Sequence, residues 1–109
     1  MTDTWTRVIS LDDLEEEELT AVDLDGQPVL LFRMGEQVSA VGGRCTHAGM
    51  PLAGAPVDFE GDDPFITCPA HGSRFFLQDG RVFRPPAAAP LPRCQVRIVD
   101  GGVELLPPT

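Results

Sequence analysis

Two short segments of the chain place a cysteine next to a histidine, and together they use both histidines of the sequence. The first is RCTHAGMPLAG, with Cys45 and His47, and the second is CPAHGSRF, with Cys68 and His71. Two thiolates and two imidazoles form a sensible four-ligand metal site. The spacings C-x-H and C-x2-H therefore indicate a metal centre built by two loops that are far apart in the sequence.

The donor types alone leave several interpretations open. One is a structural zinc ion held by two sulfurs and two nitrogens. Another is a 2Fe-2S cluster in which two cysteines hold one iron and two histidines hold the other. A third, in which the loops merely contain polar residues and bind no metal, is disfavoured. Chance seldom puts both histidines two or three residues after cysteines in loops rich in glycine and proline.

The flanking residues resemble the two cluster loops of Rieske proteins. The small or apolar residues after His47, and Pro69 and Gly72-Ser73 around His71, fit that family. The segment SRFFLQDGRV, the following PPAAAPL and the strands near the start are similar to soluble Rieske ferredoxins. The resemblance spans nearly the whole chain, and it favours the Rieske 2Fe-2S cluster over zinc or an empty Rieske-like fold.

Carried over from that family, the resemblance implies that Cys45 and Cys68 bind the inner iron, and that His47 and His71 bind the outer iron. Each loop then gives one ligand to each iron. We expect the histidine edges to reach solvent at the tip of the protein. A mostly apolar rim is expected around them, made of Ala48, Met50, Pro51, Leu52, Pro69 and Ala70. Met50 and Leu52 are equally well explained by packing over the cluster to exclude water.

Several neighbours of the ligands are also expected to contribute. Gly49, Gly54 and Gly72 are candidates for backbone positions where a side chain would not fit. Ser73 is expected to donate a hydrogen bond to a cluster sulfur, whereas Phe75 stands where quinol-oxidising Rieske proteins carry a tyrosine hydroxyl. With one of two hydroxyl donors missing, we expect a reduction potential of about −150 to +100 mV.

Met50 and Ala70 stand where quinol-oxidising Rieske proteins have two cysteines joined by a disulfide, so we expect no such bridge here. The resemblance implies a soluble ferredoxin, which carries one electron from a flavin-containing NAD(P)H reductase to a terminal oxygenase. No nucleophile elbow, phosphate loop or dinucleotide motif appears, so we expect an electron carrier and not an enzyme. Alternatives are a small subunit of a larger oxidoreductase similar to nitrite reductase, or a zinc-bound interaction module.

Acidic residues dominate the composition, with 17 Asp and Glu against 8 Lys and Arg and a net charge of −9. Residues 1–44 hold ten of the acids and three arginines. Binding to nucleic acid or to an anionic membrane needs clustered positive charge, so both are unexpected. The acidic run Glu15–Glu18 either steers the protein toward a basic partner or is a solvated face.

The sequence predicts a monomer in the cytoplasm. No apolar run approaches the ~20 residues of a membrane span, and the first ten residues lack the charged and apolar regions of a secretory signal. At 109 residues we expect one Rieske domain, 1–109. Its base strands are expected at about 1–44 and 81–109, and its cluster-binding module at about 45–80.

Short apolar runs between turn signals predict an all-β fold with an inserted loop-rich module. The resemblance implies that this fold is a Rieske-like antiparallel β-sandwich whose inserted subdomain binds the cluster. One helical turn is expected within 11–19, and residues 44–64 show little periodicity. In the last hairpin Cys94, Val96 and Ile98 are expected on the apolar face, so Cys94 is predicted to be a buried structural thiol. Strands are expected at 4–10, 20–24, 28–34, 37–41, 64–68, 74–77, 81–83, 93–99 and 103–106.

Overall fold

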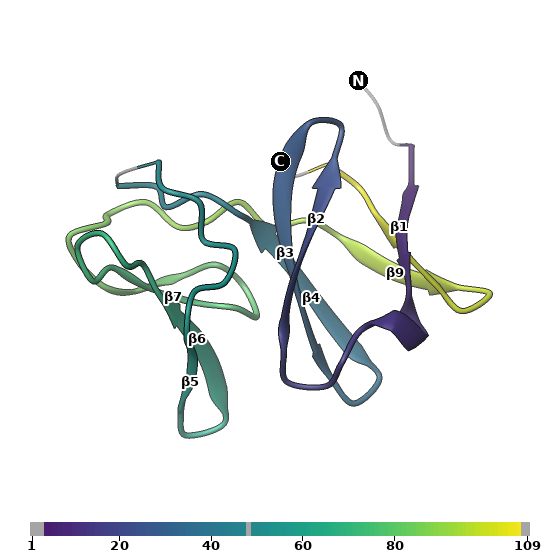
Figure 1. The fold of residues 1–109 in the computed structure, drawn as a ribbon, viewed down its shortest axis with the longest axis horizontal. Helices are drawn as coiled ribbons and strands as arrows, with labels where there is room; N and C mark the ends of the chain where they lie inside the picture. Colours follow the sequence, from purple (N-terminus) through teal and green to yellow (C-terminus); the bar gives the residue numbers. More distant parts are fainter. Residues whose placement is uncertain (1–3, 48, 108–109) are drawn as a thin grey trace.

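The computed structural model describes residues 4–47 and 49–107, and within them almost all regular structure is antiparallel β-sheet (Figure 1). The sheets have the strand orders β1-β10-β9, β2-β3-β4 and β5-β6-β7-β8. The predicted all-β class is confirmed. The elements are β1 Thr6–Ser10, η1 (a 3-10 turn) Leu11–Asp13, β2 Leu19–Leu24, β3 Gln27–Met34, β4 Gln37–Gly42, β5 Val57–Glu60, β6 Asp63–Thr67, β7 Arg74–Phe76, β8 Val82–Arg84, β9 Val96–Val99 and β10 Gly102–Leu105.

The β2-β3-β4 sheet is the middle layer of the fold. Four consecutive residues of β3, from Val29 to Phe32, are at most 2% exposed. Because side chains alternate across a strand, such a run means that both faces of β3 are covered. One face packs on the β1-β10-β9 sheet through a cluster that includes Val29, Leu31, Ala40, Cys94, Val103 and Leu105.

The other face of the middle sheet supports the four-stranded sheet and the two Cys/His loops. Leu30 and Phe32 of β3 belong to one buried cluster with Ile66 and Phe75 of that sheet. Cys45 and Cys68 lie in the same cluster. In Figure 1 the β5-β8 side stands beside the remaining strands, connected to them by the chain after β4 and the chain before β9.

Two predicted hairpin turns have the geometry that their residues favour. Asp25-Gly26 joins β2 to β3, with φ of 53° and 85°, and Asp100-Gly101 joins β9 to β10, with φ of 49° and 74°. Two positive φ values in a two-residue loop are typical of the type I′ turn, whose twist matches that of the strands. The Asp-Gly signal therefore fixes the register of both hairpins.

The structure differs from the sequence expectation at two strands. β5 falls within residues 44–64, where the sequence shows little periodicity and predicts no strand before residue 64. The apolar alternation is weak there because only Val57 of the four β5 residues is even partly buried. Ile98 was expected on the apolar face of the last hairpin but is 40% exposed. It lies on β9, the edge strand of its sheet, beyond the cover of the middle layer. Among the described residues, no helix is long and apolar enough to cross a membrane.

We predict that Gly80→Ala destabilises the fold by about 2–4 kcal/mol, because left-handed strain and a steric clash add. Gly80 has φ of 80°, and a Cβ there would collide with the carbonyl oxygen of Leu91. Gly26→Ala is the matched control, since Gly26 has φ of 85° but nothing within 4 Å of its added Cβ. That change should cost about 1 kcal/mol. Parallel urea unfolding curves measure both, and equal losses would contradict the packing described.

Candidate metal centre

The two Cys/His loops are closed by the same pair of backbone hydrogen bonds. In each, the cysteine N–H donates to the carbonyl five residues later, and the glycine four residues on donates back to the cysteine carbonyl. In the first loop the bonds join Cys45 N–H to Met50 O at 2.9 Å and Gly49 N–H to Cys45 O at 2.7 Å. The second loop repeats them, Cys68 N–H to Ser73 O at 2.7 Å and Gly72 N–H to Cys68 O at 3.0 Å.

Glycine is needed in these loops for its backbone conformation. Gly49, Gly54 and Gly72 have φ of 69°, 80° and 81°, in the left-handed region that other residues rarely adopt. A Cβ added at any of the three would meet no protein atom within 4 Å. We expected that a side chain would not fit at these positions, and with respect to the protein's own atoms that expectation is wrong. Glycine is favoured here because of the positive φ.

The four donor residues are ordered from the interior to the surface. Cys45 and Cys68 are each 2% exposed and lie in the cluster beneath the loops. His47 and His71 are exposed, and their ring centroids are 5.2 Å apart with an interplanar angle of 83°. The structure thus brings the two histidines together at the surface above two buried cysteines.

This arrangement fits two metal atoms better than one. A tetrahedral zinc site would require all four donors around one centre. A pair of imidazoles separated from a pair of thiols matches a dinuclear cluster with two nitrogen and two sulfur ligands.

A proline-rich segment, residues 85–92, is hydrogen-bonded to both loops. Thr46 of the first loop donates its hydroxyl to the carbonyl of Ala89 at 2.6 Å. Ser73, which is fully buried, accepts the Ala87 N–H at 3.0 Å through its hydroxyl oxygen. The sequence analysis missed Thr46 and this segment. The sequence did offer one indication: proline has no N–H, so Ala87 is one of the few residues of this segment that can donate a backbone hydrogen bond.

The surface around the histidines is apolar, as expected, with one correction. Met50 is 41% exposed, and Pro51, Pro69 and Ala70 are exposed as well. Leu52 is fully buried, so it packs in the core and is not part of the rim. The peptide N–H of Leu52 donates to the Gly43 carbonyl oxygen at 2.8 Å, and the Leu52 side chain lies in the same buried cluster as Cys45. Ala48 lies outside the described residues.

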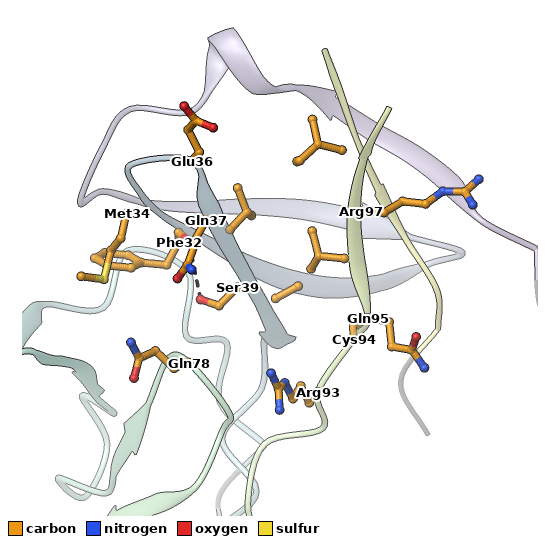
Figure 2. Close-up of a pocket in the computed structure, with 14 residues that line it drawn as sticks. Phe32, Met34, Glu36, Gln37, Ser39, Gln78, Arg93, Cys94, Gln95 and Arg97 are labelled. Atoms are coloured by element: carbon orange, nitrogen blue, oxygen red, sulfur yellow. Dashed lines mark hydrogen bonds between the residues drawn. The ribbon is translucent and has the colours of Figure 1, made fainter. Parts of the chain in front are cut away.

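Cys94 lies away from the two loops, as predicted. It is 2% exposed, and burial raises the pKa of its thiol above the usual value. Cys94 lies beside an open groove of about 740 Å³ between β4 and the chain leading into β9 (Figure 2). None of the four Cys/His residues of the loops lines this groove. The groove is therefore separate from the metal centre.

Comparison with known families identifies the fold and its cofactor. Residues 4–96 match the Rieske [2Fe-2S] domain. The chain belongs to this family. The predicted resemblance is thereby confirmed, and the Rieske protein described here carries a Rieske-type 2Fe-2S cluster. The structural-zinc interpretation is set aside.

Solved structures of similar proteins include carriers of the same size. The ferredoxin of carbazole 1,9a-dioxygenase from Nocardioides aromaticivorans IC177 superimposes with a TM-score of 0.85, at 30% identity, covering 96% of this chain and 99% of that one. A structure of reduced oxygenase in complex with oxidised ferredoxin, also from carbazole 1,9a-dioxygenase, gives 0.79 at 28% identity, with 95% and 94% covered. A protein from Mycobacterium tuberculosis assigned as an NADH-dependent nitrite reductase small subunit gives 0.79 at 26% identity, with 94% and 93% covered.

We predict that Ser73→Ala lowers the free energy of unfolding by about 1–3 kcal/mol, because it leaves the buried Ala87 N–H without an acceptor. Ser39→Ala is the control, since the Ser39 hydroxyl makes only a 3.5 Å contact with the Phe32 carbonyl. That change should cost less than about 0.5 kcal/mol. Urea unfolding of the two variants beside the parent measures the difference. Similar losses would show that the Ser73 bond does not hold the segment.

Proposed function

We propose that this Rieske protein is a one-electron carrier that takes electrons from a flavin-containing NAD(P)H reductase and delivers them to a terminal oxygenase or similar acceptor. The observation that carries the proposal is the pair of exposed imidazoles above two buried cysteines, in a chain that matches dioxygenase ferredoxins over almost its whole length. As part of the same proposal, the protein acts as a monomer in the cytoplasm.

The ligand set is proposed as Cys45 and Cys68 for the inner iron, and His47 and His71 for the outer iron. When bound, the cluster accepts and releases one electron at a time. The burial of the two cysteines favours the inner position, because it keeps water from their sulfurs. The exposure of the two histidines favours the outer position, since their ring edges can meet a partner directly.

Residues around the ligands tune and shield the site. The Ser73 hydroxyl oxygen accepts from Ala87, which leaves its own proton available for a cluster sulfur. Hydrogen bonds to sulfur raise the potential of such clusters. Phe75 is fully buried and has no hydroxyl, so it supplies no second bond of this kind. Exposed Met50, Pro51, Pro69 and Ala70 form an apolar surface suited to brief docking.

A fixed subunit of a nitrite-reductase-like complex is the second candidate, because the fold is shared with such a subunit. The exposed histidine pair favours the free carrier. The two are separated by mixing the purified monomer with a flavoprotein reductase and NADH. A free carrier is reduced and reoxidised in repeated turnovers, whereas a fixed subunit does not exchange electrons without its complex.

We predict that Cys45→Ser, His47→Ala, Cys68→Ser and His71→Ala each remove at least half of the bound iron, because each removes one of the four proposed ligands. Cys94→Ala is the matched control, being an equally buried cysteine outside the loops, and it should keep two irons and two sulfides. Iron and acid-labile sulfide assays with visible spectra make the measurement. Iron loss in the Cys94 variant, or retention in any of the four, would overturn the ligand set.

We expect the purified protein to give a single one-electron wave at about −150 to +100 mV in protein-film voltammetry. The reason is that Ser73 is the one hydroxyl donor proposed for a cluster sulfur, while Phe75 has no hydroxyl. Ser73→Ala should lower the potential, and Phe75→Tyr should raise it. A wave well above this range in the parent protein would argue against a ferredoxin role and for a high-potential donor.

A further inference from the structure

Acidic and basic residues are concentrated in different segments of the chain, which the net charge alone does not show. Residues 44–57, 64–78 and 80–99 contain no Asp or Glu, although the whole sequence has 17. These segments hold all four Cys/His ligand positions and six of the arginines, at 44, 74, 81, 84, 93 and 97. These segments are therefore cationic in a protein of net charge −9, and the five acids of this part of the chain, Asp58, Glu60, Asp62, Asp63 and Asp79, lie in the gaps between them.

The arginines divide into two groups by their partners. Arg7, Arg33, Arg81 and Arg97 each donate a hydrogen bond or join an ion pair within the protein. Four others have no such side-chain partner among the described residues: Arg44, Arg74, Arg84 and Arg93. The unpaired group lies entirely within the segments that lack acidic residues.

Two unpaired arginines, Arg44 and Arg74, adjoin the cluster loops. Arg44 directly precedes Cys45 and bridges to Pro51 across the first loop. Arg74 directly follows Ser73, the residue that closes the second loop. Arg93 is different, because it lines the groove between β4 and β9 (Figure 2).

Arg74 and Arg84 face each other across two strands. They are register partners on β7 and β8, so their side chains leave the sheet on the same face. Arg74 lies over the Phe65 ring, 5.1 Å from its centroid, and its Nε is buried without a hydrogen-bond partner. Like charges placed directly opposite are destabilising, and a buried unsatisfied donor adds to that cost. An external anion would relieve the repulsion between the two guanidinium groups.

We propose that Arg74 and Arg84 form a cationic docking surface for carboxylates on an acidic face of the redox partner. This rests on the proposed function, since it names the chemistry of the partner that approaches the exposed histidines. Paired guanidinium groups bind carboxylates in a bidentate geometry, which adds orientation to attraction. The acidic remainder of the chain strengthens that orientation, because it is repelled by the same partner.

The test measures the local electrostatic potential near the Cys/His loops with two small oxidants of opposite charge. The dithionite-reduced holoprotein is mixed in a stopped-flow instrument with ferricyanide, an anion, or with tris(phenanthroline)cobalt(III), a cation. With the parent protein the ferricyanide rate should fall as ionic strength rises. A protein that behaves as its net charge of −9 would instead give a rate that rises.

Arg74→Gln/Arg84→Gln should slow ferricyanide and speed the cobalt complex, each by about threefold or more at low salt. Arg7→Gln/Arg97→Gln removes the same charge from the β1-β10-β9 sheet and should leave both rates nearly unchanged. A change of both rates in the same direction would reveal a shift in the reduction potential or in the structure, and it would overturn the proposed docking surface. So would a parent ferricyanide rate that rises with salt. Failure of the reduced protein to react with either oxidant would instead refute the electron-carrier function itself.

Discussion

The fold depends on the burial of β3 on both of its faces. Its run from Val29 to Phe32 is covered by the β1-β10-β9 sheet on one side and by the cysteine-bearing loops on the other. Each such side chain contributes about 1.5–3 kcal/mol through its burial. A single strand thus packs against the β1-β10-β9 sheet on one face and against the Cys/His loops on the other. The loops rest on this buried strand and do not project freely from the sandwich.

The cluster loops and most strands were predictable because their signals are local. The proposed ligand residues lie two or three positions apart, and Asp-Gly turns with flanking apolar runs mark the β2–β3 and β9–β10 hairpins. The missed features depend on distant partners. Thr46 bonds to Ala89, 43 residues away, and Leu52 is buried because of what the loop folds against. β5 escaped notice because three of its four residues are exposed.

Charge shows the same division between local pattern and tertiary context. The run Glu15–Glu18 left a choice between a steering face and plain solvation, and the structure adds a third role for one member. Glu16 accepts the Gly35 N–H at 2.9 Å, while Arg33 donates to the carbonyls of Leu11 and Leu14. Part of the acidic run therefore holds the β1–β2 connection against the β3–β4 turn, which no count of charges would reveal.

The proline-rich segment at 85–92 has a consequence for the speed of electron exchange. Its bonds to Thr46 and Ser73 fasten both loops to one stiff piece of chain, in addition to the backbone bonds that close each loop. Proline has few backbone conformations, so this segment yields little when the charge beside it changes. Ligands that hardly move between the two oxidation states lower the reorganisation energy of the transfer. We therefore expect this segment to limit how far the site changes shape when its charge changes.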